Sequence, residues 1–119
     1  MSDYSDLEKK AKNYFILGLF GEKHKMTSEA VSNYFKALFA ICDMFLIKKT
    51  GFQPKDHTER FRALERTDKF LYRILDELFS VYRETYTKEL SPKRVEHIRK
   101  RIGEIFDYAK IEKPTEKDL

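Results

Sequence analysis

The sequence contains few of the residues that cross-link a chain or that break helices and strands. It contains one Cys, three Pro, four Gly and no Trp among 119 residues. A single thiol cannot form a disulfide within one chain, so an oxidising compartment is not implied. So few Gly and Pro leave little material for the turns of a many-stranded sheet. Cys42 lies inside an apolar run, where we expect a buried and inert thiol.

Two common kinds of site leave no trace in the sequence. His24, His57 and His97 show no HxxxH, HExxH or cysteine-pair spacing, so we expect no metal and interpret them as surface or loop residues. Gly18 and Gly21 lack the preceding strand and the neighbouring glycines of a phosphate-binding loop. The common nucleotide-binding folds are therefore excluded, and no cofactor is expected.

The composition describes one globular domain over residues 1–119. Hydrophobic residues make up 41% and charged residues 37% of the chain, and the net charge is +4. This charge permits contact with nucleic acid without requiring it. Asp3, Asp6 and Glu8 stand where a signal peptide has a basic start, so we expect a cytoplasmic location.

The longest apolar pattern runs over residues 27–50. Between Ala37 and Ile47 only Asp43 is charged, which predicts a helix at the centre of a bundle. This inner run is about 16 Å long, shorter than a bilayer core, so we expect no membrane span. A carboxylate in such a helix costs several kcal/mol unless it is paired, which predicts an Arg or Lys partner for Asp43. A structural ion pair and a functional role both remain open.

Capping signals and periodicity predict the other helices. Helix starts are expected at the capping residues Ser5, Asp56 and Ser91, and the apolar pattern of the fourth helix runs from Asp68. The first helix should end near Gly21 and the last near Pro114, and the short helix after Asp56 is open to merging with its successor. The amphipathic stripe of the fourth helix comprises Phe70, Leu71, Ile74, Leu75, Leu78, Phe79, Tyr82 and Tyr86. The prediction is all-α: an antiparallel up-and-down bundle of four long helices plus one short helix, with a mobile tail at 113–119.

The basic residues are concentrated in one segment. Residues 88–101 contain six Lys or Arg and two Glu, and this surplus of +4 equals the net charge of the whole chain. Arg94, His97 and Arg101 fall on one turn-spaced strip that would suit phosphates, while a solvated face is the alternative. The expected nucleic-acid contacts are Tyr86, Lys88, Lys93, Arg94, His97 and Arg101.

Four segments of the chain, 17–21, 30–40, 49–57 and 82–86, resemble the HEPN family of small helical prokaryotic proteins. The resemblance extends over most of the length. It implies a helical bundle that forms a homodimer in a toxin-antitoxin or RNA-processing system. Many members of the family are metal-independent ribonucleases, and several are encoded beside a minimal nucleotidyltransferase that acts as their antitoxin.

The catalytic motif of that family, an Arg followed five positions later by a His, is absent. The residues five places before the three histidines are Leu19, Phe52 and Pro92. Arg83 is the best match for the motif's arginine, although its fifth following residue is Lys88. One hypothesis is an RNA-binding or RNA-cleaving homodimer in which Arg83 contacts the scissile phosphate. The alternatives are a non-catalytic module that binds a nucleotidyltransferase partner or a nucleotide, and a structural dimer with a solvated basic segment.

Overall fold

The computed structural model describes the backbone of residues 2–119 and the side chains of residues 4–119. The side chain of Asp3, part of the argument on signal peptides, lies outside this range. The described chain forms α1 (Ser2–Lys23), α2 (Thr27–Thr50), α3 (His57–Thr67), α4 (Lys69–Glu84), α5 (Pro92–Ala109) and the 3-10 helix η1 (Glu116–Asp118). Residues 2–119 contain no strand, and the predicted all-α helical bundle is confirmed.

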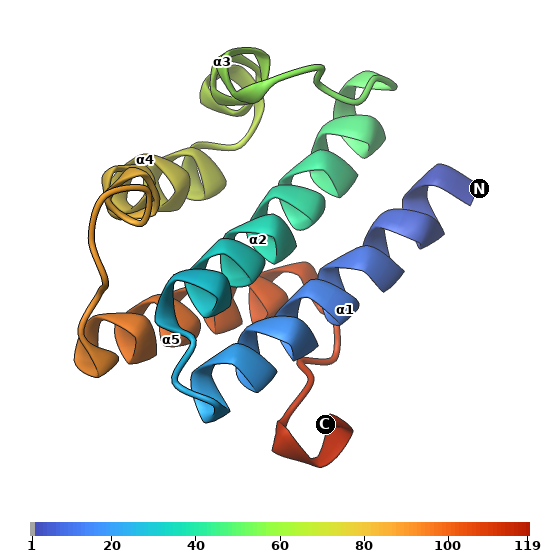
Figure 1. Ribbon diagram of the computed structural model, residues 1–119. Helices are drawn as coiled ribbons and strands as arrows, with labels where there is room; N and C mark the ends of the chain where they lie inside the picture. The colour runs from blue at the N-terminus through green and yellow to red at the C-terminus, as the bar shows by residue number, and fades with distance from the viewer. Residues whose placement is uncertain (1) are drawn as a thin grey trace.

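The apolar helix α2 lies at the centre of the bundle. It runs beside α1 in the opposite direction, α5 crosses it, and α3 and α4 pack on the side away from α1 (Figure 1). Thirteen of its 24 residues are buried, as expected for a helix that is apolar on nearly all sides. α2 is nevertheless long enough to cross a membrane and contains an 18-residue window with a mean hydropathy of 1.4, and 72% of that window is buried within the protein. The structure therefore argues against a membrane span through the burial of α2 by the other helices, and not through the length of this helix.

Two glycines allow α1 to approach α2 closely. A Cβ atom on Gly18 would lie 2.4 Å from the ring of Tyr34, and one on Gly21 would lie 3.1 Å from the backbone of Ala30. The buried Tyr34 ring occupies the space that a side chain at position 18 would need. Its hydroxyl donates to Glu22 Oε1 at 2.7 Å, which ties the end of α1 to α2.

Asp68 separates α3 from α4, so the two helices do not merge. The Asp68 N–H bonds to the carbonyl of Leu64 and closes α3, while its side chain accepts from the N–H of Leu71 and caps α4. The other carboxylate oxygen of Asp68 accepts from the Tyr108 hydroxyl at 2.9 Å. One residue therefore ends a helix, begins the next and anchors both to α5. The caps expected at Asp56 and Ser91 are also present.

Several predicted boundaries are wrong, as are the two end members of the stripe predicted for α4, Phe70 and Tyr86. α1 already begins at Ser2, so Ser5 lies inside the helix and not at its start. α1 extends to Lys23, and α5 ends at Ala109 because Lys110 adopts a left-handed φ of 57°. Phe70 is 43% exposed and lies off the buried stripe, where it contacts the Tyr108 ring. Phe70 fits the apolar periodicity of α4, but its side chain lies at the surface because it belongs to the first turn of the helix.

The end of the chain is folded at the surface. Pro114 is buried, and η1 lies against α1. The Thr115 side chain accepts from the N–H of Lys117 at 3.3 Å, and Asp118 Oδ2 accepts from the N–H of Thr115 at 2.8 Å. The mobility expected for residues 113–119 stays a prediction.

Candidate functional site

The centre of the candidate site is a buried ion pair between α2 and α3. Asp43 is 3% and Arg60 is 9% exposed. Arg60 Nε donates to Asp43 Oδ1 at 2.7 Å and Arg60 Nη2 donates to Oδ2 at 3.0 Å, a bidentate arrangement. Gln53, in the loop between the helices, donates a weaker bond to Oδ2 at 3.3 Å. The basic partner predicted for Asp43 is thereby confirmed.

Arg60 also fixes the tautomer of His57. Its Nη1 atom lies 2.7 Å from His57 Nδ1. A guanidinium can only donate, so Nδ1 must be the acceptor and the proton of the neutral ring must sit on Nε2. Burial lowers the pKa of His57, and the charge of Arg60 lowers it further. Burial and Arg60 therefore favour the neutral imidazole, with Nε2–H as its remaining donor, while the negative charges of Asp43 and Asp56 oppose this shift.

His57 belongs to a group of rings that we call the aromatic cluster: Phe39, His57, Phe79, Tyr82 and Tyr86. The His57 ring centroid lies 4.7 Å from that of Phe39, 5.4 Å from Phe79 and 6.2 Å from Tyr82. Tyr86 follows the end of α4, is 73% exposed and donates its hydroxyl to that of Tyr82 at 3.2 Å. Burial and this hydrogen bond raise the pKa of Tyr82 to about 12. Tyr86, expected within the buried stripe, is instead the cluster's exposed edge.

Arg83 lies next to the aromatic cluster near the end of α4. Its guanidinium carbon is 5.6 Å from the centroid of the Phe79 ring, the same ring that His57 contacts. The side chain is exposed and, within residues 4–119, forms no ion pair. Its donors are consequently available to an anionic group, which is the property that its expected role on a phosphate requires.

The predicted basic strip is not a free cationic surface. Arg94 donates two hydrogen bonds of 3.0 Å to the carboxylate of Glu84, and the pKa of Glu84 is lowered mainly by these bonds. Arg101 binds Glu77 and also Glu104, with contacts of 2.9 and 2.6 Å. Two members of the expected strip therefore have carboxylate partners. These acidic residues lie on α4 and α5, and the sequence pattern of residues 88–101 did not reveal that α4 would supply them.

Apart from the half-buried Arg101, the six expected nucleic-acid contacts are exposed. Lys93, Arg94 and His97 line one shallow hollow of about 240 Å³ between α4 and α5, whose apolar floor includes Val81. Lys88 lies in the turn before α5. The structure thus brings three of the six predicted residues together in this hollow, while Tyr86 belongs to the aromatic cluster.

The cluster offers hydrogen-bond donors and ring surfaces but no evident general base. His57 Nδ1 is occupied by Arg60, Asp43 is engaged by the same guanidinium, and Tyr82 stays protonated at neutral pH. Sequence reasoning missed His57 and Arg60, because it treated each histidine alone. Two signals were available: the need of Asp43 for a cation, and the three-residue spacing that places both side chains on one face of α3.

Comparisons of the chain with protein-family models, with curated proteins and with solved structures give no match. Within the described residues, no group of three His, Cys, Asp or Glu side chains is arranged to hold a metal ion. The functional argument therefore depends on the chemistry of the site itself.

Proposed function

We propose that this chain is a HEPN-type protein that binds single-stranded RNA as a homodimer in a toxin-antitoxin or RNA-processing system. The observation that carries the proposal is Arg83, an exposed guanidinium without an ion-pair partner in the described chain, beside the exposed Tyr86. Unpaired bases stack on aromatic side chains, and an adjacent guanidinium binds the phosphate backbone. Lys88, two residues beyond Tyr86 and exposed, supplies a second cation for the same strand.

Binding is better supported than cleavage. Metal-independent RNA cleavage needs a base that takes the proton of the 2′-hydroxyl group and an acid that protonates the leaving oxygen. His57 cannot take the first role because its Nδ1 accepts from Arg60, and its neutral ring can offer Nε2–H as a hydrogen-bond donor but not as a general acid. With His57 unable to serve as the base, the proposed activity is RNA binding, in which the Asp43 and Arg60 pair positions the His57 ring within the aromatic cluster.

A partner surface belongs to the same proposal. The protein's own helices bury 13 of the 24 residues of α2, which leaves little apolar surface on this helix for a second chain. Exposed apolar side chains lie instead on α1, where Leu17 and Phe20 are 49% and 47% exposed and one turn apart. This stripe supports a protein contact, either with a second copy or with a nucleotidyltransferase partner.

The test is fluorescence anisotropy of a labelled single-stranded RNA at two salt concentrations, with Arg83→Gln and Arg94→Gln compared with the wild-type protein. Both substitutions remove one positive charge. Arg83 has free donors, so its loss should weaken binding about tenfold and reduce the salt dependence by about one counterion. Arg94 is neutralised by Glu84, so its loss should change affinity by less than about twofold.

Equal losses in the two variants would show that only general charge is involved and would overturn the assignment of Arg83. Absence of RNA binding at low salt would remove the proposal altogether and favour the partner-binding alternative. Incubation of the same RNA with the wild-type protein tests cleavage directly, and cleavage that Arg83→Gln abolishes would show that a base has been overlooked.

A further inference from the structure

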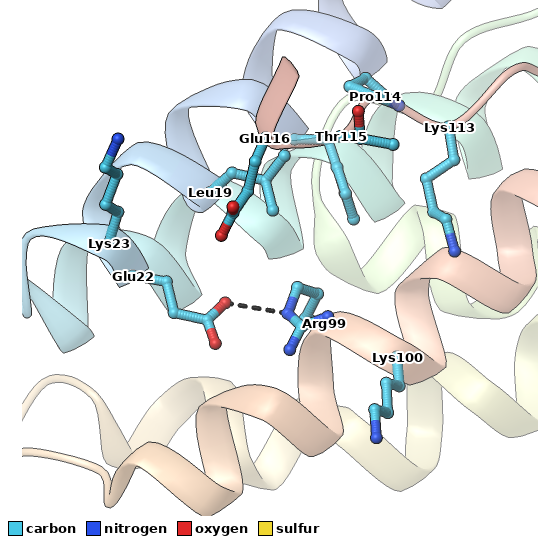
Figure 2. A pocket seen from close by; sticks show the side chains of 10 residues that line it. Leu19, Glu22, Lys23, Arg99, Lys100, Lys113, Pro114, Thr115 and Glu116 are labelled. Carbon is cyan, nitrogen blue, oxygen red and sulfur yellow. Dashed lines mark hydrogen bonds and ion pairs between the residues drawn. The ribbon is translucent and has the colours of Figure 1, made fainter. Parts of the chain in front are cut away.

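A second hollow, of about 560 Å³, lies between α1, α5 and the end of the chain (Figure 2). Its residues come from α1, α5 and positions 113–116, so it shares no residue with the aromatic cluster or with Arg83. Its volume falls within the range of about 300–1,000 Å³ that is usual for small-molecule sites.

Positive charge exceeds negative charge around this hollow. Its cations are Lys23, Arg99, Lys100 and Lys113, and its acidic residues are Glu22 and Glu116. Arg99 lies in the middle of the view in Figure 2 and donates from Nε to Glu22 at 3.0 Å, and its Nη2 atom lies 3.8 Å from a carboxylate oxygen of Glu96. The lining residues carry a surplus of two positive charges, of which Glu96 offsets one through its pairs with Arg99 and Lys100, and the remaining positive charge favours an anion.

Lys113 is one of two lining cations, with Lys23, that have no ion-pair partner among residues 4–119. In Figure 2 its side chain extends from the end of the chain toward α5. Its side chain crosses α5 at Gly103, where an added Cβ would lie 3.1 Å from Lys113 Cδ and 3.2 Å from Nζ. The absence of a side chain at Gly103 therefore leaves the room in which Lys113 reaches the hollow.

The remaining walls are less polar. Phe15 and Leu19 of α1 and Pro114 form the apolar part of the lining. A bare inorganic ion would leave this surface in contact with water, whereas an organic body attached to the anionic group would cover it. Arg and Lys donors suit a phosphate group in particular.

We propose that this hollow binds a small organic phosphate. The phosphate lies between Arg99 and Lys113, and the organic part lies against Leu19. The chain from Lys113 to Glu116 forms one wall, so the end of the protein is part of the site. This site is independent of the proposed RNA-binding function, since the two use different residues.

The experiment is an NMR titration of the isotope-labelled protein with phenyl phosphate, with inorganic phosphate and benzyl alcohol as separate probes. Phenyl phosphate should shift the backbone signals of Gly103, Lys113 and Thr115 and bind more tightly than either probe alone. Lys113→Gln should weaken binding about tenfold, because a charge-assisted hydrogen bond is lost. Lys117→Gln is the matched control: it removes the same charge from the same segment but lies outside this hollow, so affinity should stay within about twofold.

Three results would overturn the proposal: no saturable shift with phenyl phosphate, equal weakening by the two substitutions, or shifts centred on Lys117. Inorganic phosphate binding as tightly as phenyl phosphate would contradict the organic part of the assignment. Arg83→Gln should leave the titration unchanged, so failure here and failure of the RNA-binding proposal are distinguishable.

Discussion

Arg60 donates two hydrogen bonds to the carboxylate of Asp43, one of 2.7 Å to Oδ1 and one of 3.0 Å to Oδ2. The pair joins the middle of α2 to the first turn of α3, across a loop that contains Gln53. Because both groups are buried, water screens their attraction little, and each group neutralises a charge that would be costly to bury alone. The contact therefore decides how α3 sits on the central helix and where His57 points.

Removal of one partner of this pair should be strongly destabilising. We expect Arg60→Met to lower the free energy of unfolding by about 3–5 kcal/mol, because the Asp43 charge would remain buried without a partner. Urea denaturation followed by circular dichroism measures this loss. The double variant Asp43→Leu with Arg60→Met should lose clearly less than the sum of the two single variants, since no unpaired charge remains. A loss below about 1 kcal/mol for Arg60→Met would mean that the pair is exposed to water in solution.

His57 should make stability depend on pH. Its pKa is lowered in the folded protein from the usual value of 6.5. Below that value the unfolded chain binds a proton more readily than the folded chain, so the free energy of unfolding should fall as pH decreases from 6.5 toward the lowered pKa. Denaturation series between about pH 7 and pH 5 should show a shallower slope for His57→Gln, whose side-chain oxygen can still accept from Arg60.

The control for this pH effect is the exposed His97, on α5. His97→Gln should keep the wild-type slope, because the ring has no guanidinium partner in the described chain. A slope that both substitutions reduce equally would show that general charge, and not the contact with Arg60, causes the dependence.

Gly18 tests the contact between α1 and α2. Ala is ordinarily the better helix former by about 1 kcal/mol, so an unconstrained Gly→Ala change in a helix would stabilise the protein. Here the new Cβ would lie 2.4 Å from the buried Tyr34 ring, so we expect Gly18→Ala to destabilise the protein by about 1–3 kcal/mol. Thermal unfolding gives the sign, and the exposed Asn13→Ala on the same helix should be neutral or stabilising. An increase in melting temperature for Gly18→Ala would contradict the close packing.

The fold was largely predictable because its signals are local. The all-round apolar pattern identified the central helix, and Asp56 and Ser91 marked helix starts with side chains that cap them in the structure. Boundaries without such contacts were missed. α5 ends before the left-handed Lys110, and a left-handed residue at a helix end is recognised from sequence mainly when it is a glycine. The capping pattern at Ser5 matched a position inside α1.

The site was less predictable because it depends on contacts between helices. A single sequence indicated that Asp43 needs a cation, but only packing selects Arg60 from among the chain's many basic residues. The basic strip failed for the same reason: its spacing along α5 was read correctly, while Glu77 and Glu84 approach from α4. A charge run identifies a face, and the neighbouring helix decides whether that face is free.

The carboxylate of Glu84 should suppress RNA binding by the neighbouring strip. Glu84→Gln would release the Arg94 guanidinium, which now donates both of its 3.0 Å bonds to that carboxylate. We expect a several-fold gain in RNA affinity, with the salt dependence rising by about one counterion, because one more cation reaches the backbone. Glu65→Gln, an equal change of charge at an exposed position on α3, is the control in the same anisotropy assay. Equal gains in both variants would attribute the effect to net charge, whereas a gain confined to Glu84→Gln would show that the pairing with α4 masks the strip.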